Sequence, residues 1–322
     1  MPLTTDEKVL KVSRDALDAF DKENGGVHPG FRAAHAKGVM LTGAFAPTAD
    51  ARSLTRAPHV QRDSTPVTVR FSDFAGVPTI PDNDPHGASP RGFAVRFHLA
   101  EHVHTDIIGH STDNFPARTV EGTTEFLNAL SATRPTDPHP NTIERFLATH
   151  PAALAFVQAP KPIPTSFARE SFFAVSAFKF TNAQGQSRFG RYRILPVAGP
   201  EYLDDAAAAA QGADFLMDEI RERVARKPIG LRIVVQLAEE GDVTDDATVR
   251  WPESRPQIDL GRLTLDALVP DDASAQRQII FDPIPRVDGI EPSADPLFEP
   301  RANIYLMSGR RRRGERRAPH MG

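Results

Sequence analysis

Two residues near the C-terminal end, Arg301 and Tyr305, carry side chains that together could support metal chemistry. They stand four positions apart, and a helix from Arg301 to Ser308, after the Pro-rich run ending at Pro300, would place both on one face. A phenol is normally neutral at pH 7, but a neighbouring guanidinium favours the phenolate, and a trivalent metal favours it more. The pair therefore suits a tyrosinate ligand to haem iron, although an ordinary surface pair or a half-buried tyrosine has the same pattern.

The composition excludes several other kinds of site. The 322 residues include no cysteine, which rules out disulfides, a thiol nucleophile, iron–sulfur clusters and cysteine-ligated haem. With 40% hydrophobic and 25% charged residues, the chain is typical of a soluble globular protein, and its net charge of −4 predicts no specific nucleic-acid binding. No apolar run approaches the ~18 residues of a membrane span, and the amphipathic N-terminus lacks a signal-peptide core. We expect a cytoplasmic protein.

The elements that must position such a site are strands and helices without a regular β–α–β alternation. The segment 65–74 alternates clearly, with Val69 and Phe71 on one face and Arg70 and Ser72 on the other. We predict one α+β domain over residues 1–322, built on an antiparallel β-barrel or sheet with surrounding helices. Further strands are expected at 31–45, 91–99, 105–109, 172–180, 187–195, 229–237, 261–268 and 277–281, and helices at 6–20, 121–132, 141–149 and 204–225.

The last segment, residues 310–322, contains six arginines between positions 310 and 317. A block of like charge is usually mobile and solvated, and this is the prediction for the tail. Binding to nucleic acid or to an anionic surface is the alternative. Its first arginines could also reach an anionic group of a cofactor held by Tyr305.

A series of short motifs resembles the haem catalases, in the order and spacing of that family. The resemblance begins with Arg-Ala-Ala-His-Ala-Lys-Gly at 32–38 and covers residues from about 30 to 312. The other matching pieces are Val-Arg-Phe-Ser at 69–72, Pro-Arg-Gly-Phe-Ala-Val-Arg-Phe at 90–97, Asp-Ile-Ile-Gly at 106–109, Phe-Lys-Phe-Thr-Asn-Ala-Gln-Gly at 178–185, Phe-Asp-Pro at 281–283, Gly-Ile-Glu at 289–291, Asp295, Arg301 and Tyr305. The length is similar to that of the small catalase-related peroxidases, which keep little more than the haem-bearing barrel.

The resemblance implies a catalase-like antiparallel β-barrel that binds haem b, iron protoporphyrin IX. It implies a peroxidase that reduces hydrogen peroxide or organic hydroperoxides with a small-molecule electron donor and has weak or no catalase activity. The expected assembly is a homodimer.

The family motifs also assign roles to individual residues. His35 matches the distal base that moves a proton between the two peroxide oxygens, and Ser72 would fix its ring. Tyr305 matches the axial iron ligand, and Arg301 would hold it as phenolate. The family positions for the haem propionates correspond to Arg32 and Arg70, with Arg312 as a third candidate. Phe115 would pack on the porphyrin, or it is a plain core phenylalanine.

The main departure from the family follows Gly109. Full catalases have an asparagine there that orients peroxide, whereas this chain has His110 followed by Ser111. Asn114 is near enough in sequence to substitute, and His110 could itself serve as a polar group of the pocket. Loss of the amide should impair positioning of the second peroxide that catalases oxidise, which favours peroxidase over dismutase activity.

Three other functions remain open. One is rearrangement of fatty-acid hydroperoxides to allene oxides, as some catalase-related proteins perform. Another is non-enzymatic haem binding or storage, which needs no distal base such as His35. The third is a non-haem metal site, and its candidate ligands are His98, His102, His104 and His110.

Overall fold

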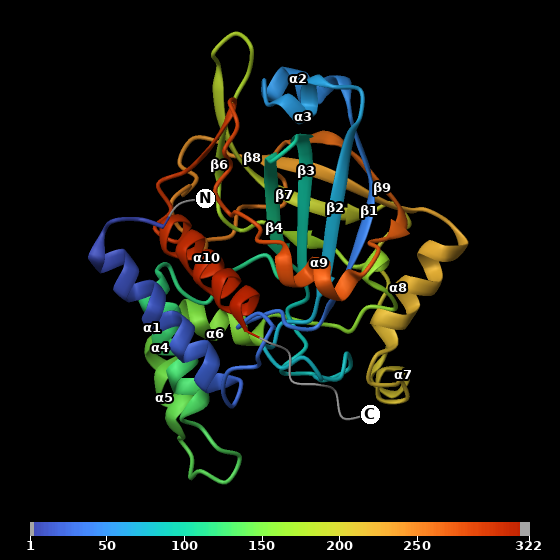
Figure 1. Ribbon diagram of the computed structural model, residues 1–322. Helices are drawn as coiled ribbons and strands as arrows, with labels where there is room; N and C mark the ends of the chain where they lie inside the picture. The colour runs from blue at the N-terminus through green and yellow to red at the C-terminus, as the bar shows by residue number, and fades with distance from the viewer. Residues whose placement is uncertain (1–2, 316–322) are drawn as a thin grey trace.

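Eight antiparallel strands close into a barrel in the computed structural model, which describes residues 3–315. Around the barrel the order is β7-β5-β4-β3-β2-β1-β9-β8, and pairing of β7 with β8 completes the ring. Two further strands, β6 and β10, extend β7 outside the ring (Figure 1). The strand bounds are β1 Gly38–Pro47, β2 Thr65–Ser72, β3 Gly92–Ala100, β4 Val103–His110, β5 Phe172–Phe173, β6 Phe178–Thr181, β7 Ser187–Pro196, β8 Ile229–Leu237, β9 Gln257–Leu268 and β10 Ile290–Pro292.

The alternation in β2 separates the barrel interior from its outer face. Val69 and Phe71 are fully buried in the main hydrophobic core, which fills the barrel. Arg70 and Ser72 point the other way, toward a cavity outside the barrel. The predicted two-faced strand is confirmed, and its polar face is the one available for a functional site.

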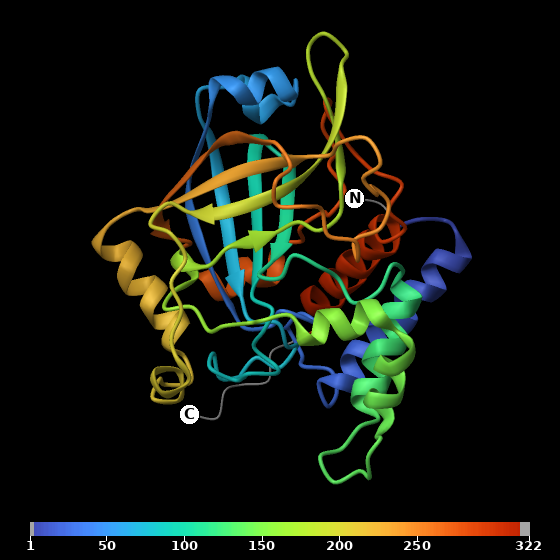
Figure 2. The same cartoon turned by 180° about the vertical axis from the view of Figure 1, so that it is seen from behind.

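Helices cover the outside of the barrel on two sides (Figures 1 and 2). On one side α1 packs against both α4 and α10, with α5 and α6 beside them, whereas α7 and α8 lie on the opposite side. No helix within residues 3–315 has the length and apolar character required to cross a lipid bilayer. The helix bounds are α1 Glu7–Glu23, α2 Ala49–Leu54, α3 Pro58–Gln61, α4 Val120–Ser131, α5 Thr142–Thr149, α6 Pro151–Gln158, η1 Phe167–Arg169, α7 Asp205–Ala209, α8 Phe215–Arg226, α9 Asp272–Gln278 and α10 Phe298–Gly314.

Three of the strand predictions need correction. The strand expected at 172–180 is two short strands, β5 and β6, separated by residues 174–177. The strand expected at 31–45 begins only at Gly38, because His35 has a φ of 58°, which no extended strand allows. The strand expected at 277–281 is the end of helix α9 and the irregular segment after it. The side chain of Asp271 accepts a hydrogen bond from the backbone N–H of Ser274 and thereby starts this helix.

The helix expected at 204–225 is two helices, α7 and α8, separated by a turn at residues 210–214. A tertiary contact explains where the second one starts. The carboxylate of Asp82, distant in sequence, accepts hydrogen bonds from the backbone N–H groups of Leu216 and Met217, at 2.7 and 3.2 Å. A carboxylate at this end satisfies donors that an unbroken helix would use internally.

The prediction of a mobile basic tail is wrong for its first part. Residues 310–314 continue α10, and Arg312 is buried with only 2% of its surface exposed. The last arginines, 316 and 317, lie outside the described residues.

Candidate functional site

A cavity of about 230 Å³ lies between the outer face of β2, β3 and β4 and the helix α10. Most of the residues predicted from the sequence line it, although they come from distant parts of the chain. Apolar side chains from α1, α4 and α6 complete the walls. The predicted residues that line it are Arg32, His35, Arg70, Ser72, His110, Phe115, Arg301, Tyr305 and Arg312.

The backbone of His35 is held in the left-handed region by its neighbours. Its N–H donates to the carbonyl of Phe74 at 2.6 Å, and its own carbonyl accepts from Nη2 of Arg70 at 2.8 Å. Such a conformation is uncommon for a residue with a side chain and persists only where the surroundings fix it. The constraint aims the imidazole into the cavity.

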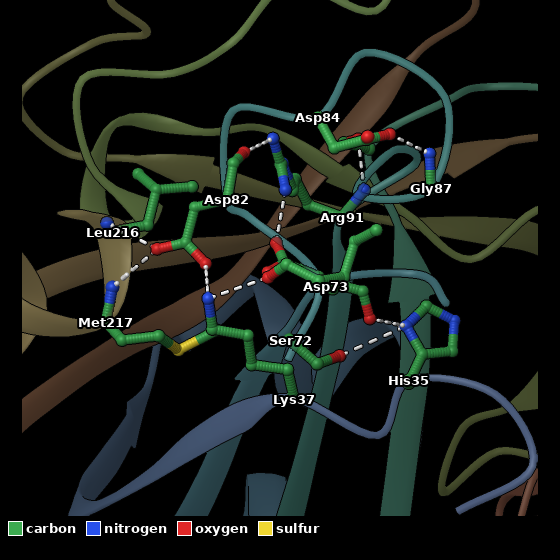
Figure 3. Close-up of polar contacts among 12 residues, drawn as sticks. His35, Lys37, Ser72, Asp73, Asp82, Asp84, Gly87, Arg91, Leu216 and Met217 are labelled. Carbon is green, nitrogen blue, oxygen red and sulfur yellow. Dashed lines mark hydrogen bonds and ion pairs between the residues drawn. The ribbon is translucent and has the colours of Figure 1, made fainter. Parts of the chain in front are cut away.

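Hydrogen bonds also fix the tautomer of His35 (Figure 3). Nδ1 lies 2.9 Å from the backbone carbonyl of Asp73 and 3.1 Å from Oγ of Ser72. Because a carbonyl can only accept, Nδ1 must carry the proton, and Nε2 is left as an unprotonated base. Burial, together with the nearby Arg70 cation, lowers the pKa of His35 to about 3, so the ring is neutral.

Gly92 explains how the ring of His35 fits against the barrel. A Cβ at this position would lie 2.4 Å from Oγ of Ser72 and 2.5 Å from Nδ1 of His35, both closer than atoms tolerate. The strand register places Ser72, Gly92 and His110 side by side on β2, β3 and β4. Only a glycine in the middle of this row leaves room for the imidazole.

Behind His35, a buried charged network holds the segment that supplies the Asp73 carbonyl (Figure 3). The carboxylate of Asp73 forms an ion pair with Arg91, and both side chains are fully buried. Arg91 also donates to the carbonyl of Asp82, whose carboxylate pairs with Lys37 at 2.6 Å. Burial raises the pKa of Asp73, although the Arg91 guanidinium opposes the shift. The network lies on the far side of the imidazole from the cavity and can act only by positioning it.

Helix α10 presents one polar stripe to the cavity. Arg301, Tyr305, Ser308 and Arg312 follow the spacing of a helical face, and all four line the cavity. Nη2 of Arg301 lies 3.4 Å from the hydroxyl of Tyr305, and its guanidinium is 5.9 Å from the centre of the ring. The expected placement of both side chains on one helical face is confirmed. Arg312, whose match to the family was uncertain in the sequence, belongs to the same stripe.

Three arginines, Arg32, Arg70 and Arg312, gather at one end of the cavity, and their hydrogen-bond partners among the described residues are backbone carbonyls and the amide oxygen of Gln276. Arg32 and Arg312 both donate to the carbonyl of Ile279. Burial, together with a neighbouring arginine in each case, lowers the pKa of Arg70 to about 9 and that of Arg312 to about 8. Cations brought together without a direct ion-pair partner favour an anionic ligand, although the Asp272 carboxylate partly opposes the shift of the Arg70 pKa.

His110 and Asn114, the two candidates to replace the asparagine of full catalases, lie in different surroundings. His110 lines the cavity, whereas Asn114 is buried outside it, with an Oδ1 that finds no partner among the described residues. His110 has its ring centre 6.1 Å from that of Phe115, which also lines the cavity. Of the two candidates, His110 is therefore the one on the cavity wall.

The proposed non-haem site is contradicted within the part of the chain that the structure describes. No group of three or more His, Cys, Asp or Glu side chains is arranged to hold a metal there. His98 and His104 face each other across β3 and β4, while His110 lies at the other end of β4. His102 is exposed at the turn between the strands.

Comparison with known proteins identifies the family. A family model described as catalase matches residues 11–318. The chain belongs to the catalase family. It is 34% identical to a catalase-related peroxidase of Mycolicibacterium paratuberculosis over 302 residues, 93% of this chain and 94% of that one. A catalase-related peroxidase of Synechococcus elongatus is 34% identical over 294 residues, 90% of this chain and 86% of the other.

The fold of solved catalases is also shared. A fungal catalase superposes with a TM-score of 0.77 over 97% of this chain, at 24% identity. Catalase A from Saccharomyces cerevisiae gives the same TM-score and identity over the same share. This chain spans 64% and 65% of those two catalases. The predicted catalase-like α+β barrel is thereby confirmed.

The residues around the cavity of this catalase-family chain fit the haem that the family implies. An apolar slot suits a macrocycle, and the three unpaired arginines suit its two carboxylates. The sequence had indicated these residues, but it gave no role to Gly92, Asp73 or Arg91. Gly92 and Arg91 lie inside a motif that matches the family, so their spacing was visible, whereas their contacts with His35 and Asp73 depend on the fold.

Proposed function

We propose that this chain uses haem b to reduce hydrogen peroxide or organic hydroperoxides with electrons from a small-molecule donor. Membership of the catalase family and the two relatives named catalase-related peroxidases support a haem peroxidase. One observation carries the proposal for this particular chain. A neutral imidazole, His35, and a phenol, Tyr305, line a single cavity that also contains three unpaired arginines.

Each group would have a separate part in holding the cofactor. Tyr305 would supply an oxygen ligand to the iron, and Arg301, whose Nη2 lies 3.4 Å from its hydroxyl, would favour the phenolate form. Arg32, Arg70 and Arg312 bind the propionates. Phe115 forms part of the apolar wall. Bound haem would supply the redox chemistry. An anionic oxygen ligand suits that role, because it stabilises the higher oxidation states of iron.

His35 moves the proton of the reaction. Its unprotonated Nε2 takes the proton from the hydroperoxide O–H and returns it to the leaving oxygen as the O–O bond breaks. The balanced conversion is ROOH plus two protons and two electrons to ROH and water, with both electrons supplied by the small-molecule donor. Ser72 and the Asp73 carbonyl keep the ring in the required tautomer.

Dismutation should be weak. It requires a second peroxide to be oriented for oxidation, a step that depends on geometry within about an ångström. Neither His110 nor Asn114 reproduces the amide of full catalases, because one is an imidazole and the other lies outside the cavity lining.

An optical spectrum of purified protein tests the proposal. We expect a high-spin ferric Soret band that changes on addition of hydrogen peroxide and is lost in Tyr305→Phe. Tyr202→Phe is the control, because Tyr202 is 41% exposed and hydrogen-bonded to Glu170 away from the cavity. A colourless protein that cannot be reconstituted with haem would refute the proposal.

His35→Ala then separates catalysis from cofactor binding. The variant should keep the Soret band and lose peroxide turnover by about 10²–10⁴-fold, the usual contribution of a positioned acid or base. Unchanged turnover with a guaiacol-type donor would remove His35 from the reaction. Incubation with a lipid hydroperoxide and no electron donor should give no allene oxide. Formation of an allene oxide would show that the chain rearranges hydroperoxides and would contradict the proposed peroxidase function.

A further inference from the structure

His110 lies in the same cross-strand row as the distal imidazole. Ser72, Gly92 and His110 are direct neighbours across β2, β3 and β4, so their side-chain positions share the outer face of the barrel. His35 occupies the space above Gly92, at the centre of the row. The imidazoles of His35 and His110 therefore both line the cavity on the side of this row. They stand 75 positions apart in the sequence.

The hydrogen bonds of His110 fix which of its nitrogens carries the proton. The backbone N–H of Thr112 donates to Nδ1 at 3.3 Å, and the Thr112 hydroxyl lies 2.8 Å from the same atom. A backbone N–H can only donate, so Nδ1 must be the unprotonated acceptor. In a neutral ring the proton is then on Nε2. Burial lowers the pKa of His110 to about 3, with Arg301 and His35 adding to the effect, so the ring is neutral near pH 7.

The Nε2 of His110 has no hydrogen-bond partner among the residues that the structure describes. It is a buried atom, and it makes no hydrogen bond to any residue within the described range 3–315. A buried donor without a partner is destabilising, so such groups usually have a ligand, a water or a catalytic role. The atom belongs to a side chain on the cavity wall, where an occupant could accept its hydrogen bond.

The tautomer of His35 is the opposite one. There a backbone carbonyl, that of Asp73, contacts Nδ1, so the proton is on Nδ1 and Nε2 is free to accept. The two rings are of the same residue type and are both neutral, yet the backbone partner of each Nδ1 gives them different functions. One offers an acceptor and the other a donor.

Resting on the proposed peroxidase function, we propose that His35 and His110 form a complementary acceptor–donor pair that binds a neutral hydroperoxide. His35 accepts the O–H proton, and His110 donates its Nε2–H to a peroxide oxygen. His110 keeps its proton throughout and orients the substrate. It thus supplies one N–H donor, without the second N–H or the carbonyl oxygen of an amide, and it cannot act as a second base.

Nuclear magnetic resonance tests the tautomers directly. The protein, ¹⁵N-labelled at histidine and loaded with diamagnetic gallium(III) protoporphyrin, would be assigned with His110→Asn and His35→Gln. Long-range ¹H–¹⁵N correlations should show the proton on Nε2 of His110 and on Nδ1 of His35. A proton on Nδ1 of His110, or on both of its nitrogens at pH 7, overturns the proposal. If the porphyrin does not bind, the haem assignment fails, and the same spectrum of the porphyrin-free chain still decides the tautomers.

Fluoride binding to the ferric protein tests the donor role without relying on turnover. Fluoride accepts hydrogen bonds, so loss of one donor should weaken it by about tenfold. We expect this loss in His110→Leu, affinity within about threefold of the parent in His110→Asn, and no change in His98→Leu on the exposed end of β3. Equal fluoride affinity in His110→Leu and the parent, with the Soret band intact, refutes the donor role.

Discussion

The imidazole of His35 occupies the space in which the side chain of residue 92 would otherwise lie. An ideal Cβ on Gly92 would be 2.5 Å from Nδ1 and 2.8 Å from Cε1 of this ring. The wall of the cavity at this point is therefore the bare backbone of β3. The position of the His35 ring therefore depends on the absence of a side chain at Gly92 as well as on the side chains that contact it.

Gly92→Ala should displace the imidazole of His35 and reduce peroxide turnover, because the new methyl group would clash with Nδ1 of the His35 ring. We expect a loss of at least about tenfold with haem retained, since small misplacements near reacting atoms are costly. Steady-state kinetics and the Soret band measure the two effects. Gly212→Ala is the control, because a Cβ there meets no atom within 4 Å. Full turnover in Gly92→Ala would contradict the proposed position of the ring.

Arg70→Met should weaken haem retention. A hydrogen bond to a charged group contributes about 1.5–3 kcal/mol, which corresponds to roughly 10–100-fold in affinity. The rate of haem transfer to apomyoglobin measures the loss. Arg188→Met, on the exposed part of β7, should retain haem like the parent. Equal transfer rates for the two variants would argue that the three-arginine cluster does not bind the propionates.

Asp73→Asn should strongly destabilise the protein, because it leaves the fully buried Arg91 without its counter-charge. Breaking a buried pair from one side costs about 3–5 kcal/mol, whereas removing both charges costs less. Urea unfolding should therefore show Asp73→Leu with Arg91→Met to be more stable than Asp73→Asn. Asp259→Asn, which breaks the half-exposed pair with Arg232 at 2.8 Å, should cost under about 1 kcal/mol. Similar losses for the buried and exposed pairs would contradict this reasoning.

His59 should make the fold sensitive to acid. It is a core histidine 4.5 Å from the Phe97 ring centre, neither of its nitrogens has a partner among the described residues, and burial lowers its pKa to about 3. Between its ordinary pKa of 6.5 and 3, the unfolded chain binds a proton that the folded chain does not. The free energy of unfolding therefore falls as pH falls through this window, by about 1.4 kcal/mol per pH unit.

His59→Leu removes this proton and should flatten the pH dependence. Urea unfolding at pH 7.0 and 5.5 measures the slope, and the variant should lose about one proton's share of it. The variant should keep the contributions of His35 and His110 to the slope, because the pKa values of both histidines are also lowered by folding. His86→Leu, at an exposed position, should leave the slope unchanged. A variant of His59 with the parent slope would show that this ring is protonated in the folded core.

Local pattern was sufficient for the elements whose side chains alternate or repeat. The two faces of β2 follow from the order of Val69, Arg70, Phe71 and Ser72, since successive strand residues point to opposite sides. The pairing of Arg301 with Tyr305 follows from their helical spacing in the same way. Prediction from local pattern failed where a residue distant in sequence determines the backbone conformation. Helix α8 is an example, because it starts where the carboxylate of Asp82 accepts hydrogen bonds from its first backbone N–H groups.

The sequence by itself determined which residue types are available: a base, a phenol, a set of arginines and no thiol. It also determined, through ordered motifs, that these belong to a catalase-type barrel. Only the tertiary structure decided that His110 lies in the cavity and Asn114 outside it, and that Arg312 faces inward. The proton positions on His35 and His110 likewise depend on which backbone group lies beside each Nδ1, a carbonyl in one case and an N–H in the other. For His35 that group comes from a segment 38 residues away, so spacing alone carries no information about it.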